Sequence, residues 1–218
     1  MKYRVIPVTH FKQNCSIIWC ESSLRGALID PGGEADKILR VLKKEGIKIE
    51  SILLTHGHID HVGAAKELSE RLDVPVIGPH PADAYWLEML PEEAIMFDFP
   101  KIDKLIPHQW LWDKQQVSIG ELKLEVIHCP GHTPGHVVFY HPESKLAFVG
   151  DVLFKGSVGR SDFLGGDEQQ LMDSIHNKLL PLGDDVTFVS GHGAKSTFGH
   201  ERKHNPFLTE DTDELIES

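Results

Sequence analysis

Histidine and aspartate side chains cluster in one short segment, His56–His61, which reads His-Gly-His-Ile-Asp-His. Imidazole nitrogens are good ligands for zinc, and carboxylates bind hard and borderline divalent ions. In an extended chain His56 and His58 point to the same side, and the glycine between them permits a close approach. Asp60 and His61 fall where a helix is expected to begin, so they face a neighbouring position. Four ligands in six residues exceed the needs of one tetrahedral ion, so the segment predicts two adjacent ions.

Three further candidate ligands, His132, Asp151 and His192, follow apolar segments that we expect to be strands. Each comes directly after a glycine, and each alone has an ordinary explanation as a turn or loop residue. Their joint appearance with the segment His56–His61 favours a metal site instead, because a rigid scaffold presents functional side chains on the loops at its strand ends.

The elements that must position these residues are short strands alternating with helices. Runs rich in β-branched residues predict strands at 3–8, 15–19, 26–29, 51–54, 74–77, 122–127, 137–140, 146–149 and 186–189. Helical periodicity predicts helices at 35–44, 62–72, 82–90 and 168–180, with Asp167 as the N-cap of the last. The Pro- and aromatic-rich segment 79–113 shows no clear periodicity, and outside its one helix we expect irregular chain. This order of elements predicts sheets covered by helices.

The composition excludes several classes of partner. The 218 residues contain 22 Lys and Arg against 33 Asp and Glu, a net charge of −11, which disfavours a nucleic-acid partner. Neither a signal peptide nor an apolar run of about 18 residues is present, so no membrane partner is expected. Cys15, Cys20 and Cys129 match no disulfide or zinc-finger pattern and predict reduced thiols in a cytoplasmic protein. One catalytic domain is predicted over 1–208, followed by an acidic, flexible tail over 209–218.

The string His-X-His-X-Asp-His, followed by Gly-His, Gly-Asp and Gly-His, resembles the metallo-β-lactamase-fold hydrolases over nearly the whole chain. The resemblance implies an α/β fold, an αββα sandwich of two mixed β-sheets packed face to face with helices on both outer faces. It also implies two divalent metal ions per chain, with zinc expected first and iron or manganese as alternatives. One ion would be held by His56, His58 and His132, the second by Asp60, His61 and His192, and Asp151 would bridge them.

Within that superfamily the segments 55–64, 130–136, 149–154, 159–162 and 199–207 resemble the glyoxalase II group, the hydroxyacylglutathione hydrolases, and its short bacterial branch in particular. The resemblance implies hydrolysis of a small-molecule thioester, with S-lactoylglutathione as the leading substrate, a reaction of methylglyoxal detoxification. Asp60 would orient or deprotonate the metal-bound water. An anionic substrate needs local positive charge, so Arg160 and Lys155 are the candidate substrate contacts. Full-length members carry a C-terminal helical domain that contacts glutathione, and without it we expect few contacts to the glutathione arm.

Several alternatives stay open. A sulfur dioxygenase of the same fold would use one iron to oxidise glutathione persulfide, and the complete second ligand set weighs against it. A β-lactamase or lactonase shares the metal chemistry, whereas length and charge disfavour the nuclease branch. A structural zinc site is closed by four ligands, often cysteines, while a His and Asp set leaves room for water. Cys129 is a candidate for a catalytic thiol, which a dinuclear site does not need. His136 is expected to donate a hydrogen bond to a ligand residue or to pack where the next strand begins.

Overall fold

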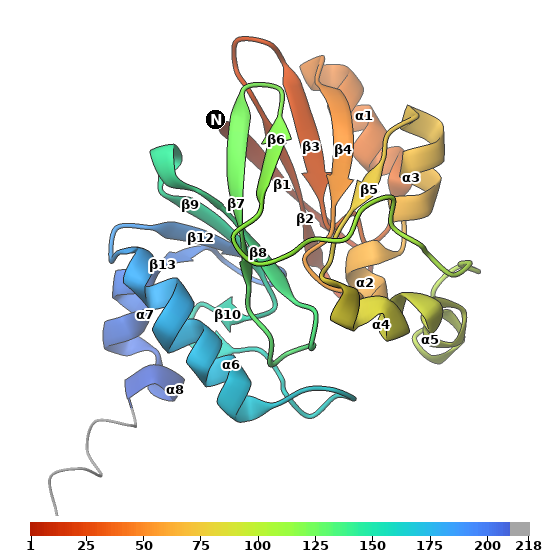
Figure 1. Cartoon of the computed structure of the whole chain (residues 1–218). Coiled ribbons are helices and arrows are strands. Elements are labelled where there is room, and N and C mark those ends of the chain that lie inside the picture. The colour runs from red at the N-terminus through yellow and green to blue at the C-terminus, as the bar shows by residue number, and fades with distance from the viewer. Residues whose placement is uncertain (210–218) are drawn as a thin grey trace, which may run out of the picture.

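Figure 1 shows the computed structural model, in which two β-sheets pack face to face and helices cover both outer faces. The structure describes residues 1–209. This architecture confirms the αββα sandwich of the metallo-β-lactamase type that the sequence predicts. Among the described residues, no helix combines the length and the apolar character needed to cross a membrane.

The first sheet is built from the N-terminal part of the chain, in the order β1-β2-β3-β4-β5. Its strands are β1 (Lys2–Val8), β2 (Gln13–Trp19), β3 (Arg25–Ile29), β4 (Lys48–Leu53) and β5 (Val76–Ile77). Strands β1 to β3 are antiparallel, whereas β3, β4 and β5 are parallel. Parallel neighbours need crossover connections, and these are provided by α1 (Ala35–Glu45) and α3 (Ala65–Leu72), which both lie on the outer face of this sheet (Figure 1).

The second sheet has the order β13-β12-β9-β8-β7-β6. Its strands are β6 (Gln116–Ile119), β7 (Leu122–His128), β8 (Val137–His141), β9 (Leu146–Gly150), β12 (Thr187–Ser190) and β13 (Ser196–Thr197). A small separate hairpin pairs β10 (Leu153–Phe154) with β11 (Ser157–Val158). The helices α6 (Glu168–Ser174), α7 (Phe198–His204) and α8 (Pro206–Thr209) follow, and α6 and α7 cover the outer face.

Apolar side chains alternate between the two faces of the strands in the second sheet, so the sheet needs one hydrophobic core on its inner face and another on its outer face. In β8, Phe139 belongs to the cluster between the two sheets, whereas its neighbours Val138 and Tyr140 belong to the outer cluster that includes Leu171 of α6 and Phe198 of α7. Successive strand residues point to opposite faces, so a strand that is apolar on both faces must be covered on both. A third cluster packs the first sheet against α1 and α3.

The helix predicted over 62–72 is wrong in its extent, because the structure divides this region into α2 (Ile59–Val62) and α3. In a continuous helix the amide of Ala64 would donate to the carbonyl four residues earlier. It donates instead to the carbonyl of Pro31, in the turn after β3, at 2.9 Å. The break therefore attaches the segment that carries Asp60 and His61 to the end of the neighbouring strand.

The helix predicted over 35–44 is confirmed as α1, whereas the other two helix predictions are corrected. The helix expected at 82–90 is a 3₁₀ turn (Pro81–Asp83) followed by α4 (Ala84–Glu88) and α5 (Leu90–Met96). Pro91 lies in the first turn of α5, where a proline is tolerated, so it begins a helix instead of ending one. The helix expected over 168–180 is α6, continued by a π-helical turn at Ile175–Leu179 and a 3₁₀ turn at Leu180–Leu182.

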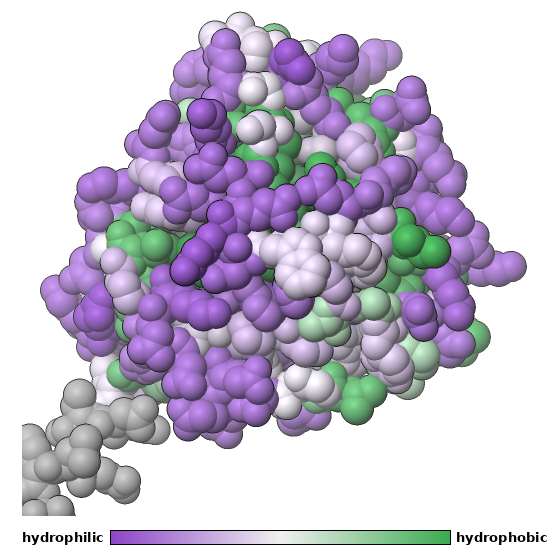
Figure 2. Space-filling model, viewed as in Figure 1, coloured by the Kyte–Doolittle hydropathy of each residue, from purple (hydrophilic) through white to green (hydrophobic). Residues whose placement is uncertain are grey.

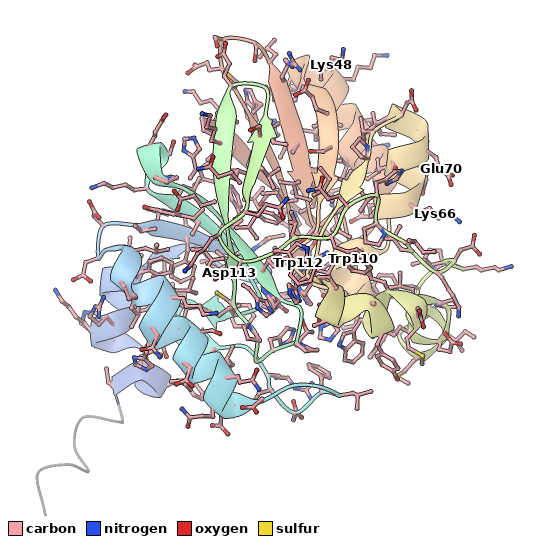
Figure 3. All side chains as sticks on the ribbon, in the orientation of Figure 1. Lys48, Lys66, Glu70, Trp110, Trp112 and Asp113 are labelled. Atoms are coloured by element: carbon pink, nitrogen blue, oxygen red, sulfur yellow. The ribbon has the colours of Figure 1, made fainter. Side chains whose placement is uncertain are left out.

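The predicted N-cap of α6 is confirmed, since the Asp167 side chain accepts a hydrogen bond from the amide of Gln170 at 2.9 Å. The segment between α5 and β6 is largely irregular, as expected, and it crosses the molecule with Trp110, Trp112 and Asp113 along it (Figure 3). The tail predicted over 209–218 falls outside the described residues except for Thr209, which ends α8.

Candidate metal centre

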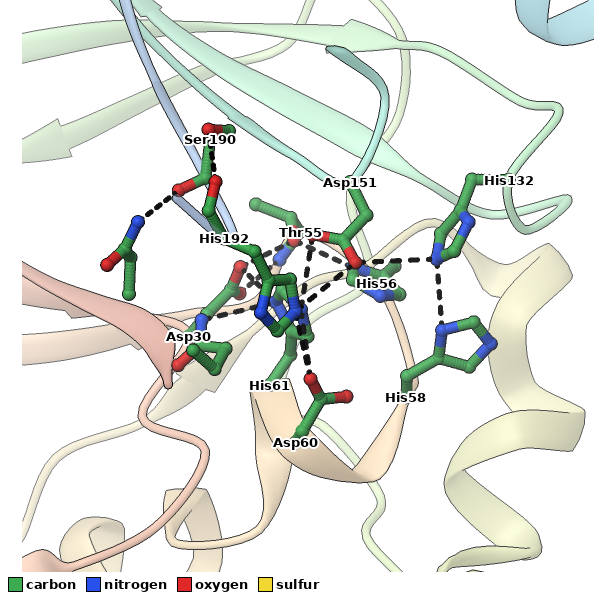
Figure 4. Close-up of polar contacts among 12 residues, drawn as sticks. Asp30, Thr55, His56, His58, Asp60, His61, His132, Asp151, Ser190 and His192 are labelled. Atoms are coloured by element: carbon green, nitrogen blue, oxygen red, sulfur yellow. Dashed lines mark hydrogen bonds and ion pairs between the residues drawn. The ribbon is translucent and has the colours of Figure 1, made fainter. Parts of the chain in front are cut away.

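Strands from both sheets bring the candidate ligands to one edge of the sandwich (Figure 4). The first sheet contributes the loop after β4 and the short helix α2, and the second sheet contributes the loops after β7, β9 and β12. The structure thereby brings together all seven residues that the sequence analysis selects, namely His56, His58, Asp60, His61, His132, Asp151 and His192.

The first group consists of three nearly buried imidazoles, His56, His58 and His132, whose ligand atoms lie within 4.8 Å of one another. Nδ1 of His58 and Nε2 of His132 are 3.0 Å apart. Burial lowers the pKa of His58 to about 3 and the pKa of His56 well below its ordinary value. These rings are therefore neutral at physiological pH, which is the form of histidine that binds a metal ion.

The second group combines Asp60 with His61 and His192, again with ligand atoms within 4.8 Å. Nε2 of His192 lies 3.1 Å from Oδ2 of Asp60, and Nε2 of His61 lies 3.8 Å from the same oxygen. Burial opposes protonation of His61, but the carboxylates of Asp151 and Asp60 outweigh it and raise the pKa of His61 well above its usual range. Concentrated negative charge at this position favours a cation.

Asp151 lies between the two groups. Its Oδ2 is 3.8 Å from Nε2 of His132 in the first group and 3.6 Å from Nε2 of His192 in the second. Its Oδ1 is 3.4 Å from Nε2 of His61. Burial raises the pKa of Asp151, but the neighbouring imidazoles, His61 first, lower it by more, so the side chain is ionised. One carboxylate therefore faces both groups, as a bridging ligand must.

The outer nitrogens of three candidate ligands are fixed by oxygen acceptors. Nδ1 of His61 donates to Oδ2 of Asp30 at 2.9 Å. Nδ1 of His132 donates to the carbonyl oxygen of Arg160 at 2.7 Å, and Nδ1 of His192 donates to the carbonyl oxygen of Phe11 at 3.2 Å. A proton on Nδ1 leaves the lone pair of Nε2 directed at the centre, the arrangement found behind metal-ligating histidines.

Asp30, the residue directly after β3, is a functional residue that is absent from the predicted set. Its carboxylate accepts hydrogen bonds from the amide of Thr55 at 2.7 Å and from the Thr55 hydroxyl at 2.6 Å, besides the bond from His61. Asp30 also lies within ligand distance of His56 and His61. Since both of its oxygens already accept hydrogen bonds, we interpret it as a support for His61. The signal was present, since Asp30 follows an apolar strand as the selected ligands do.

Asp83, in the segment to which the sequence analysis assigns no role, connects the two histidine loops. Its fully buried carboxylate accepts hydrogen bonds from the amide of Gly57 at 2.9 Å and from the hydroxyl of Thr133 at 2.8 Å. It accepts a third from the amide of Gly135. Gly57 lies between His56 and His58, and Thr133 follows His132, so one side chain holds both halves of the first group in register.

Two glycines permit the close packing of the centre. A Cβ at Gly57 would lie 2.5 Å from the Cβ of Trp86, so glycine at this position allows Trp86 of α4 to pack against the loop between His56 and His58. A Cβ at Gly191 would lie 2.0 Å from Oδ1 of Asp151. The loop that carries His192 is tied to the first sheet by Asn14, whose side chain donates to the carbonyl of Ser190 at 3.0 Å.

Several buried polar atoms of the centre have no hydrogen-bond partner within the described part of the chain: Nε2 of His56, His58 and His61, and Oδ1 of Asp151. An unpaired buried polar atom costs about 1–3 kcal/mol, so a concentration of them in one place indicates a missing ligand. Nitrogen and carboxylate donors that converge in this way fit divalent transition-metal ions.

His136 supports the centre by accepting a hydrogen bond from the amide of Asp151 at 3.1 Å. Burial raises the pKa of the Cys129 thiol to about 12, so the structure gives no support to a catalytic thiolate there. The three cysteines are free, as predicted.

A cleft of about 780 Å³ opens beside the candidate ligands, and both predicted substrate contacts, Lys155 and Arg160, line it. The guanidinium of Arg160 donates two hydrogen bonds to the carboxylate of Asp162, at 2.9 and 2.8 Å, and lies 4.4 Å from the ring centroid of Phe163. Arg160 is therefore already paired with an acid, whereas Lys155 is exposed and forms no ion pair with the described residues.

Comparison with known proteins gives consistent matches over nearly the whole chain. The family model of the metallo-beta-lactamase superfamily matches residues 8–192. Hydroxyacylglutathione hydrolase GloC of Haemophilus influenzae is 44% identical over 209 residues, which cover 95% of this chain and 98% of GloC. The crystal structure of the BLEG-1 B3 metallo-beta-lactamase, 36% identical, has a TM-score of 0.89 and covers 95% of this chain and 100% of its own. TTHA1623 in a di-iron-bound form, 37% identical, has a TM-score of 0.86 with coverages of 94% and 100%.

Proposed function

Since the chain belongs to the metallo-beta-lactamase superfamily and is a metallo-hydrolase of that fold, we propose that it hydrolyses 2-hydroxyacyl thioesters, with S-lactoylglutathione as the leading substrate. The observation that carries the proposal is the pair of three-residue ligand groups that share Asp151 at the floor of an open cleft. The 44% identity to a relative named hydroxyacylglutathione hydrolase supports this choice of substrate.

We propose that each group holds one divalent ion, His56, His58 and His132 the first and Asp60, His61 and His192 the second, with Asp151 bound to both. Bound divalent ions would polarise the thioester carbonyl and lower the pKa of water near to neutrality. Zinc is the first expectation, and iron is a direct alternative because TTHA1623 was solved in a di-iron-bound form.

The reaction adds water to the carbonyl carbon and breaks the carbon–sulfur bond, so that a carboxylic acid and a thiol are formed. One proton of the water must therefore reach the sulfur. We propose that Asp60 orients the attacking water and accepts this proton, because its carboxylate is only partly buried and faces the cleft. Among the described residues that line the cleft, Lys155 is a cation without an ion pair and is available to an anionic substrate, and Arg160 contributes less because Asp162 already pairs with it.

Two other activities are tested in parallel. Hydrolysis of a β-lactam is a candidate because a 36%-identical structure is named a B3 metallo-beta-lactamase. Oxidation of glutathione persulfide requires a single iron, and the second ligand group argues against it.

The experiment is steady-state kinetics on one preparation stripped of metal and then loaded with zinc, iron or manganese. Thiol release from S-lactoylglutathione, ring opening of a chromogenic β-lactam and oxygen consumption with glutathione persulfide are compared at equal protein concentration. We expect metal-dependent thiol release to exceed the other two activities. A preparation that consumes oxygen or opens the β-lactam efficiently, yet releases no thiol, would contradict the proposed function.

A further inference from the structure

The cleft beside the candidate metal ligands is walled mainly by aromatic and methionine side chains. Phe11, Tyr85, Met96 and Phe97 line it, and each keeps between 36% and 74% of its surface exposed. Figure 2 shows green and pale-green side chains over the region of α4 and α5, among hydrophilic neighbours. Folding normally buries large apolar side chains, so their gathering around one opening indicates that the opening receives an apolar group.

Further aromatic side chains of the cleft pack against the candidate ligands themselves. The ring of Trp86 packs against His58 with centroids 4.5 Å apart, and Phe163 packs against the same histidine at 4.9 Å. On the other side Phe154 lies 6.3 Å from His192. An apolar group attached close to the reacting carbonyl would therefore contact apolar side chains beside the candidate ligands as well as those near the opening of the cleft.

Charges of opposite sign line the cleft from different elements. Its cationic residues, Lys155 and Arg160, follow β10 and β11 in the chain, whereas its acidic residues other than the candidate ligands, Glu92 and Glu93, belong to α5. On α5, Glu92 would repel an anionic arm. We call the apolar side chains of the α4 and α5 region, Tyr85, Trp86, Met89, Met96 and Phe97, the α4–α5 wall.

We propose that the preferred substrates are thioesters whose acyl group carries an apolar substituent larger than the methyl of a lactoyl group. This inference rests on the proposed thioesterase function. The acyl substituent lies against the α4–α5 wall, and the anionic thiol arm extends along the side of Lys155. A cleft of about 780 Å³ exceeds the needs of a lactoyl group, and a methyl cannot cover the wall that the structure exposes.

The test compares S-lactoylglutathione with S-mandeloylglutathione, which differ only by a phenyl in place of the methyl. Relative kcat/KM is corrected for the rates of the two thioesters with hydroxide in solution. We expect the mandeloyl thioester to be preferred by at least about tenfold, since burying a larger apolar group in a hydrophobic site gives discrimination of this order. A mandeloyl preference smaller than about twofold, or any preference for the lactoyl thioester, would overturn the inference.

A matched pair of variants on one helix assigns the preference to the wall. Met96→Ser should reduce the mandeloyl preference by about threefold or more, because Met96 lines the cleft. Ile95→Ser should leave the ratio unchanged, because Ile95 is 86% exposed on the same helix and does not line this cleft. Equal effects of the two substitutions would refute the assignment.

Binding of the acid products separates this inference from the proposed function. Dissociation constants of mandelate and lactate are measured by calorimetry on the metal-loaded chain. If neither thioester is hydrolysed, the proposed function fails. Mandelate binding about tenfold tighter than lactate, with the difference reduced in Met96→Ser but not in Ile95→Ser, would then still support the apolar wall, and equal binding would overturn it.

Discussion

Replacing Asp83 by asparagine should weaken metal binding while hardly changing the stability of the metal-free fold. Oδ2 of Asp83 accepts from Gly57 and Thr133, and Oδ1 accepts from Gly135. An amide has one oxygen, so Asp83→Asn keeps two of these bonds at most and turns its NH₂ group toward the third donor. One unpaired buried donor costs about 1–3 kcal/mol.

A second effect of Asp83→Asn raises the stability of the folded chain. Burial raises the pKa of Asp83 to about 6, so the ionised side chain carries a penalty of about 3 kcal/mol at neutral pH that a neutral amide avoids. Because the two terms offset each other, the unfolding free energy of the metal-free chain should change by no more than about 2 kcal/mol. The positions of the two histidine loops depend on the hydrogen bonds alone, so zinc affinity should fall by about 10- to 100-fold.

The assay is competition for zinc with a chromophoric chelator, together with chemical unfolding of the metal-free chain. The matched control is Asp113→Asn, because the exposed Asp113 accepts one backbone hydrogen bond, from His128 at 2.8 Å, which an amide oxygen can also accept. We expect wild-type zinc affinity in the control. Wild-type affinity in Asp83→Asn as well would show that Asp83 does not position the histidine loops.

Four further outcomes are expected. Elemental analysis should give about two metal equivalents per loaded chain, and Asp151→Asn should lower both metal occupancy and turnover with a near-normal circular dichroism spectrum; unchanged turnover would show that Asp151 is misassigned. Arg160→Ala should raise KM only about two- to fivefold with kcat nearly unchanged, because Asp162 already pairs with the guanidinium and the backbone carbonyl that holds His132 remains; a large loss of kcat would contradict this. Burial, with a contribution from Asp60, raises the pKa of Glu93 to about 8. The folded state thus holds a proton that the unfolded state loses, so the unfolding free energy of the metal-free chain should decrease as pH rises from about 4.5 to 8, and Glu93→Gln should flatten this slope in denaturant titrations.

Nine of the strands and the residues that converge at the centre could be predicted because each depends on local pattern, whereas β6 and the short strands β10, β11 and β13 were not predicted. Runs of β-branched residues indicate the strands, and a histidine or aspartate within two residues after such a run indicates a site at a sheet edge, as at His56 and Asp151. Their convergence is a consequence of the fold, in which the loops after β4, β7, β9 and β12 meet at one edge of the sandwich.

The supporting residues could not be predicted because their partners are remote in sequence. Asp83 contacts residues 26 and 50 positions away, at Gly57 and Thr133, and lies in a segment without clear periodicity. The break between α2 and α3 likewise follows from a bond to Pro31, which no helical pattern encodes. Arg160 was selected for its charge, whereas the contact with His132 uses its backbone carbonyl, and that role is independent of residue type.

The proposed ligands of each ion come from two different sheets, and this should make the stability of the protein in a cell depend on metal. Each proposed ion takes ligands from both halves of the sandwich, so it acts as a cross-link between residues remote in sequence, such as His58 and His132, 74 positions apart along the chain. An ion that binds only the assembled sandwich shifts the folding equilibrium by mass action, and each tenfold excess of free metal over the dissociation constant adds about 1.4 kcal/mol. The abundance of this protein should therefore follow the supply of metal. Metal starvation should make the chain more susceptible to proteolysis, in addition to removing its activity.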